Sequence, residues 1–125
     1  MSSSQVPKIL VVLYSLYFFQ LPAQTPIPDL EEDYPYGTSL NEANLEKYGL
    51  DIKSLIKAQK QEEAIKHIKQ FFLPQLSELE KSYPKQLLTP LVWSNFILSG
   101  YSGEEEVAAM LGELYLSITR SHPEW

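Results

Sequence analysis

The chain has 125 residues, a formal net charge of −6 and no cysteine. This length allows one domain of modest size, and 44% hydrophobic residues are enough to build its core. The negative charge argues against a protein that follows nucleic-acid phosphates, and the lack of cysteine excludes disulfides, thiolate metal sites and thiol catalysis.

The first segment, residues 1–24, has the order of regions found in secretory signal peptides. Lys8 supplies a positive charge, residues 9–19 are almost wholly apolar, and the more polar residues that follow end in a small side chain. The apolar run is shorter than the roughly 20 residues of a spanning helix. We therefore expect a cleaved signal peptide and a secreted, periplasmic or luminal protein. The alternatives are a retained anchor over residues 9–23, which would make the protein membrane-associated, and a buried core segment.

Residues 25–38 predict an acidic, extended arm. They contain three prolines, a glycine and the acidic run at residues 31–33, with no apolar period, and this composition disfavours helix and favours a mobile linker. Tyr34 and Tyr36 interrupt the acidic arm and are candidate contacts to a basic partner. Tyr34 follows three acids, so in an animal secretory protein it is also a candidate for sulfation. The plain alternative is a solvated linker.

The rest of the chain, residues 39–121, is expected to form the folded domain, beginning with a short helix over residues 40–48. Ser39 and Glu42 match the capping box, in which each side chain satisfies a free backbone N–H of the first turn. Gly49 is suited to end that helix in a left-handed conformation.

The longest amphipathic stretch follows over residues 52–83, with Asp51 as its expected N-cap. Its apolar stripe lapses over residues 59–63, where core positions become polar, and then resumes in phase across Pro74. We expect this helix to be kinked or broken near residues 59–63 and near Pro74.

Two further helices are predicted over residues 90–99 and 103–120. Thr89 should cap the first, which is apolar nearly all round, and that pattern predicts the most buried element, with Trp93 in the core. Ser102 and Glu105 repeat the capping box before the second helix. Together these patterns predict an all-α fold: a small antiparallel bundle of about four helices.

No motif for catalysis or for a cofactor stands out in this sequence. None of the serines lies in a nucleophile turn, and the few glycines form no phosphate-binding loop. His67 follows Glu63 by one helical turn, and we interpret it as a surface histidine beside an acid. We therefore expect a non-enzymatic protein without a metal or a cofactor.

One surface feature remains as a candidate binding site. Lys53, Lys57 and Lys60 are spaced to share one helix face, while the chain as a whole is acidic. They could contact an acidic partner or lipid head groups, or they could be an ordinary solvated surface. The sequence favours an exported helical protein that acts by binding another protein, without nucleic acid. The alternatives are an accessory subunit of a membrane complex, with residues 9–23 retained, and an enzyme with an unrecognised site.

Overall fold

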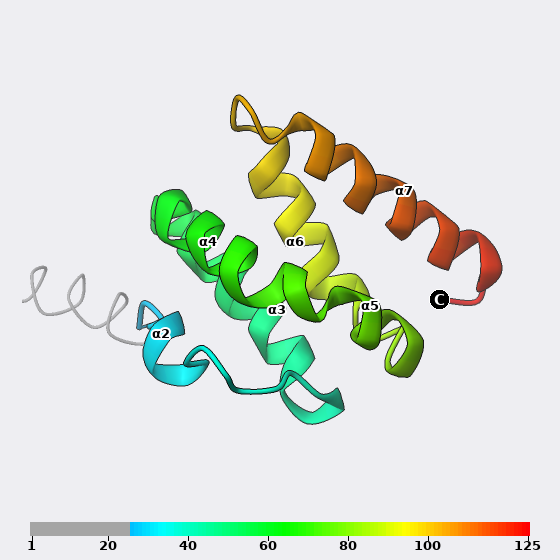
Figure 1. Cartoon of the computed structure of the whole chain (residues 1–125), viewed down its shortest axis with the longest axis horizontal. Helices are drawn as coiled ribbons and strands as arrows, with labels where there is room; N and C mark the ends of the chain where they lie inside the picture. Colours follow the sequence, from blue (N-terminus) through cyan, green and yellow to red (C-terminus); the bar gives the residue numbers. More distant parts are fainter. Residues whose placement is uncertain (1–25) are drawn as a thin grey trace, which may run out of the picture.

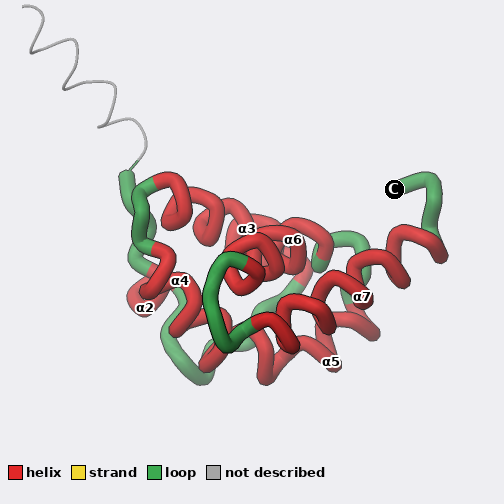
Figure 2. Tube along the Cα trace, turned by 90° about the horizontal axis from the view of Figure 1, so that it is seen from above, coloured by secondary structure: helices red, strands yellow, loops and turns green. Residues whose placement is uncertain are grey.

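The computed structural model describes residues 26–125, and this part of the chain contains helices and no strand (Figures 1 and 2). The all-α prediction is therefore confirmed. The expected signal peptide lies outside the described residues, and none of the described helices is long and apolar enough to cross a membrane. The helices are α2 (Leu30–Asp33), α3 (Glu42–Lys57), α4 (Gln61–His67), the π-helical turn η1 (Ile68–Phe72), α5 (Leu73–Ser82), α6 (Leu88–Ser99) and α7 (Glu105–Ser121).

Helix α3 joins two segments that the sequence analysis separates. It begins at an Asn41 N-cap, where Asn41 and Asn44 form the capping box, so the pair predicted at Ser39 and Glu42 is wrong. It then runs through Gly49 without a stop. A Cβ atom on Gly49 would lie 2.6 Å from the backbone nitrogen of Pro90. Glycine is therefore needed here because α3 and α6 approach closely, and not because a helix ends.

The long amphipathic stretch is broken where its stripe lapses and continuous where it contains proline. Between α3 and α4 the chain turns through Gln59, which has a φ of +60°, and this confirms the break predicted near residues 59–63. Helix α4 continues through η1 into α5. In η1 the Leu73 N–H donates to the Ile68 carbonyl, five residues back. The wider turn lets the chain pass Pro74, which lacks an N–H, without ending the helix.

The remaining two helices start differently from the sequence prediction. Helix α6 begins at Leu88 without a side-chain cap from Thr89. Helix α7 begins at Glu105 without a cap from Ser102, although the Glu105 carboxylate accepts a bond of 2.7 Å from the Gly103 N–H. Helix α6 begins two residues before the predicted start at residue 90, and α7 begins two residues after the predicted start at residue 103. Thr89 and Ser102 therefore do not occupy the N-cap positions.

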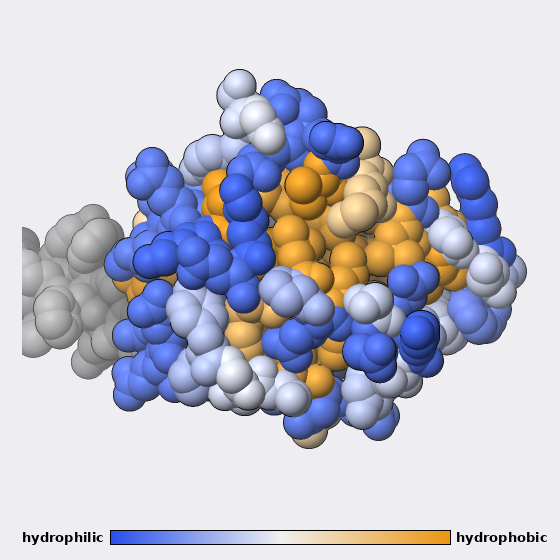
Figure 3. Space-filling view, viewed as in Figure 1, coloured by the Kyte–Doolittle hydropathy of each residue, from blue (hydrophilic) through white to orange (hydrophobic). Residues whose placement is uncertain are grey.

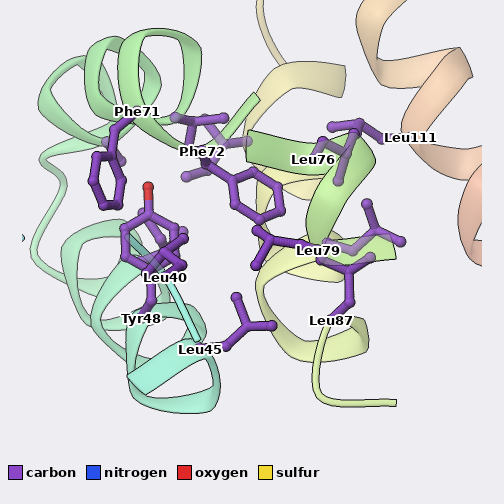
Figure 4. Close-up of a cluster of buried hydrophobic side chains, with 14 of the residues drawn as sticks. Leu40, Leu45, Tyr48, Phe71, Phe72, Leu76, Leu79, Leu87 and Leu111 are labelled. Atoms are coloured by element: carbon purple, nitrogen blue, oxygen red, sulfur yellow. The ribbon is translucent and has the colours of Figure 1, made fainter. Parts of the chain in front are cut away.

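The core lies where α3, η1, α5, α6 and α7 converge, and Figure 4 shows part of it. Aromatic side chains fill its centre: the ring centroids of Tyr48 and Phe72 are 5.8 Å apart, and neither side chain is exposed. Successive long helices alternate in direction across the bundle (Figure 1), so α3 and α6 run side by side in the same direction.

Helix α6 is less buried than its sequence predicts. Its inner face carries buried residues such as Leu91 and Leu98, but Val92 is 38% exposed and Phe96 is 58% exposed. Trp93, expected in the core, is half-buried. The helix is apolar nearly all round although Val92 and Phe96 meet solvent, and exposed apolar side chains that lie together can mark an interaction site.

Candidate functional site

The exposed apolar face of α6 lies beside the basic residues of α3. We call this region the α3–α6 surface and define it by Lys53, Lys57, Val92, Trp93 and Phe96. The Lys53 ammonium lies 5.0 Å from the centroid of the Trp93 ring, which is cation–π distance. Trp93 and Phe96 in turn form an edge-to-face pair with centroids 6.1 Å apart. Phe96 is the most exposed large apolar side chain in residues 26–125.

The two lysines of this surface have no acidic partner in the described part of the chain. The ion pairs of residues 26–125 engage other cations, such as Lys47 with Asp51 at 2.8 Å and Lys69 with Glu104 at 2.7 Å. Lys57 lies one turn after Lys53 on α3, and residues four apart share a helix face. The structure therefore places the Lys53 ammonium over the half-buried Trp93 ring, which in turn pairs with the exposed Phe96 ring.

Lys60 does not belong to this surface, contrary to the sequence expectation. It lies beyond the end of α3, 3.8 Å from the Glu63 carboxylate, and lines a cavity of about 500 Å³ beneath the acidic arm. The three-residue spacing that grouped it with Lys57 is interrupted by the turn at Gln59. The predicted lysine face is therefore reduced to Lys53 and Lys57.

A second apolar surface lies between α5 and α7 and is visible in Figure 3. The two helices carry half-buried apolar side chains that pack against the core, among them Leu73 on α5 and Val107 and Leu114 on α7. They carry no aromatic anchor comparable to Phe96. This surface is therefore a comparison for the α3–α6 surface rather than the stronger candidate.

The acidic arm is packed onto the domain and is not the free, extended segment that its sequence predicts. Asp29 caps the short helix α2, and Leu30 and Tyr34 are buried. The Tyr34 hydroxyl donates to the Asp51 carboxylate at 2.9 Å, so Asp51 anchors the arm and does not cap a helix. Burial, with this carboxylate nearby, raises the pKa of Tyr34. A tyrosine in this position is inaccessible for sulfation, whereas Tyr36 remains 48% exposed.

His67 connects the acidic arm to α3 from beneath, and the interpretation of it as a surface residue is wrong. Its side chain is only 2% exposed. Its Nε2 atom lies 3.0 Å from the Tyr34 carbonyl oxygen, and its Nδ1 atom lies 3.0 Å from the Tyr48 hydroxyl. Because a carbonyl can only accept, Nε2 carries the proton and Nδ1 accepts from Tyr48. Burial lowers the pKa of His67, against the opposing effects of the Tyr34 carbonyl and the Glu31 charge.

The α3–α6 surface is the candidate site that these contacts define. Residues 26–125 contain no cluster of three His, Cys, Asp or Glu side chains placed to hold a metal ion. Comparison with known proteins finds no matching family model, no matching curated protein and no matching solved structure.

Proposed function

We propose that this domain is a non-catalytic binding protein and that the α3–α6 surface contacts its partner. The observation that carries the proposal is the exposed Phe96 ring, which lies beside Trp93 and near two lysines without acidic partners. Aromatic residues are enriched among the side chains that dominate binding energy at protein interfaces. The surface fits a partner segment that carries an apolar side chain flanked by carboxylates.

The two parts of this surface would contribute differently to binding. Covering an exposed phenylalanine contributes about 1.5–3 kcal/mol, because apolar area leaves water. Lys53 and Lys57 would mainly accelerate encounter with an acidic segment and make it sensitive to salt, since exposed charges are screened. Affinity should therefore depend on the ring, and the association rate on the lysines.

We further infer that the protein is exported, because residues 1–24 have the composition of a signal peptide. N-terminal sequencing of the native protein tests this inference. A mature chain that begins near Gln24 or Thr25 supports export. An intact Met1 or Ser2 would contradict it and would favour the accessory subunit of a membrane complex.

The binding proposal can be tested without knowing the natural partner. A displayed library of random peptides is selected on the immobilised full chain, and the dissociation constants of the enriched peptides are measured in solution. We expect these peptides to combine Asp or Glu with Leu, Phe or Trp, and Phe96→Ala to weaken them at least tenfold. The matched control is Leu114→Ala, on the surface between α5 and α7, which should leave the affinity unchanged.

Two results would contradict the proposal. One is selection of peptides without acidic residues whose binding is insensitive to Phe96→Ala. The other is binding of the full chain to vesicles of anionic lipid, lost in Phe96→Ala, with no peptide selected. The second result would assign the same surface to a membrane, where basic and aromatic side chains also bind.

A further inference from the structure

The acidic arm is held to the domain by several contacts, two of which involve His67. Leu30 and Tyr34 insert into the core, the Tyr34 hydroxyl bonds to Asp51, and the Tyr34 carbonyl accepts from His67. The Tyr36 ring stacks over the His67 ring with centroids 5.4 Å apart. Between these contacts the arm does not close against α4, because a cavity of about 500 Å³ lies there. His67 therefore supports the arm from below.

This arrangement fully satisfies a neutral His67. One ring nitrogen donates to Tyr34 and the other accepts from Tyr48, so both nitrogens are satisfied without a second proton. The bond from Nε2 to the Tyr34 carbonyl would persist and strengthen in an imidazolium, so the cost of a second proton falls on Nδ1 and on the burial of a charge. A proton on Nδ1 would make it a donor facing the Tyr48 hydroxyl, which would have to turn its own hydrogen away. Tyr48 is fully buried among aromatic rings, including Phe71 and Phe72, which offer that hydrogen no strong acceptor.

The surroundings of His67 do not supply a buried counter-charge. The acidic arm faces it with Glu31, Tyr34 and Tyr36, and α3 faces it with Tyr48. The cavity beside the ring has both signs of charge in its lining, and these belong to Asp29, Glu31, Lys60, Glu63 and Lys66. The acids of this group are exposed to solvent, so they favour an imidazolium only weakly, and the nearby lysines oppose it.

We propose that His67 is a proton-operated latch: the acidic arm is docked while His67 is neutral and detaches from α3 and α4 when the ring gains a proton. Detachment moves the Tyr34 carbonyl and the Tyr36 ring away and lets water reach the imidazolium through the cavity. Leu30 and Tyr34 of the arm belong to the same core as the helices, but the packing between α3 and η1, such as that of Tyr48 on Phe72, does not pass through the arm. We therefore expect the helices from α3 to α7 to stay folded when the arm detaches. This inference does not rest on the proposed binding function.

The test is an NMR titration of the isotope-labelled full chain from pH 7.5 to pH 4.5. It follows the His67 ring and the backbone amides of residues 29–36, 88–99 and 105–121. We expect the ring and the arm amides to titrate with one midpoint, below the ordinary histidine value of about 6.5. The amides of α6 and α7 should stay in place. In His67→Gln, the arm amides should no longer change in this range, whereas His122→Gln should behave as the wild type.

A second variant separates a latch from a merely structural histidine. Tyr34→Phe removes the bond to Asp51 but keeps the backbone carbonyl that His67 contacts. Weaker docking makes protonation easier, so the midpoint of the arm amides should move upward, toward the ordinary histidine value. This variant and the wild type carry the test even if His67→Gln does not fold.

The proposal is overturned by any of four results. The first is a ring that titrates while the arm amides stay still, and the second is a ring that stays neutral to pH 4.5 with the arm docked. The third is an arm that responds to pH with the same midpoint in His67→Gln. The fourth is a change in the amides of α6 and α7 together with those of the arm, which would mean that the whole domain unfolds.

Discussion

The two sides of helix α3 are built in opposite ways. The side that faces the acidic arm and α4 is closed at Tyr48 and His67, which are buried and whose polar atoms have partners, although the cavity beneath the arm lies at its edge. On the side that faces α6, Gly49 lies in close contact with the start of that helix, whereas farther along α6 the ring of Phe96 is exposed. One helix therefore carries a buried aromatic core on one side and borders an exposed aromatic ring on the other.

We expect the two sides of α3 to contribute to different properties, the buried side to folding stability and the exposed side to binding. A closed side with satisfied polar groups contributes to folding, since burial of apolar area is the main stabilising term. An exposed phenylalanine contributes little to folding, and its free energy can be gained only when something covers it. Substitutions on the two sides should therefore affect different measurements.

The largest expected difference is between two phenylalanines. Phe72→Ala removes a fully buried ring and should lower the free energy of unfolding by about 3–5 kcal/mol. Phe96→Ala removes an exposed ring and should change it by less than about 1 kcal/mol. Urea unfolding followed by circular dichroism measures both. Equal losses in the two variants would show that the side of α6 we describe as exposed is part of the core.

Two glycines test how closely neighbouring helices approach each other. Gly49→Ala would place a Cβ atom 2.6 Å from Thr89 Cγ2 and from the Pro90 nitrogen, and this overpacking should cost about 1–3 kcal/mol. Gly112→Ala is the control, because its Cβ would meet only Asn95 Nδ2, at 3.6 Å. In Gly112→Ala the higher helix propensity of alanine should raise the free energy of unfolding by up to about 1 kcal/mol. A stabilising Gly49→Ala would contradict the close contact of α3 and α6.

The closed side should make stability depend on pH. Because burial lowers the pKa of His67, the folded state binds fewer protons at this residue than the unfolded state. The contribution is complete above the unfolded pKa of about 6.5 and is lost as the pH falls through the folded value, with a slope of at most about 1.4 kcal/mol per pH unit.

Urea midpoints measured at pH 7.5 and pH 5.5 test this dependence. The wild type should be less stable at pH 5.5, and His67→Gln should show a smaller difference between the two values. His122→Gln should resemble the wild type, because His122 is only partly buried, near the C-terminus. An equal pH dependence in wild type and His67→Gln would assign the effect to other groups.

The smallest effect concerns the edge of the exposed side. Lys53→Ala removes the ammonium that lies over Trp93 and should cost about 0.5 kcal/mol. Lys57→Ala, one turn further along α3, should leave stability unchanged within error. Both variants should slow association with an acidic peptide at low salt, and a rate that matches the wild type would remove the lysines from the binding surface.

The sequence predicts the helical fold and much of its layout, since apolar periodicity reports local structure. It correctly predicts the break near residues 59–63, where core positions turn polar. It misplaces Gly49, because a glycine that ends a helix and a glycine that admits a neighbouring helix look alike in a sequence. Only the position of Pro90 distinguishes them, and that contact joins distant parts of the chain.

The candidate site is harder to predict for the same reason. Lys53 and Lys57 are visible from their spacing, but Phe96 is hidden in a helix that is apolar all round, where periodicity cannot tell an exposed face from a buried one. His67 and Tyr34 are joined by a bond across 33 residues of sequence. The acidic composition around Tyr34 indicates a free arm, and only the tertiary contacts with Asp51 and His67 override that indication.

The most direct test of the α3–α6 surface uses the indole N–H signals of the two tryptophans. An acidic, apolar peptide from the selection is added to the labelled full chain, and both signals are followed by NMR. Trp93 lies within the α3–α6 surface, whereas Trp125 stacks on His122 at the C-terminus, with centroids 3.8 Å apart. We predict that the Trp93 signal shifts in a saturable manner, together with the amides of Val92 and Phe96, while Trp125 stays in place. A saturable change confined to Trp125, or to Leu73, Val107 and Leu114 between α5 and α7, would contradict the account.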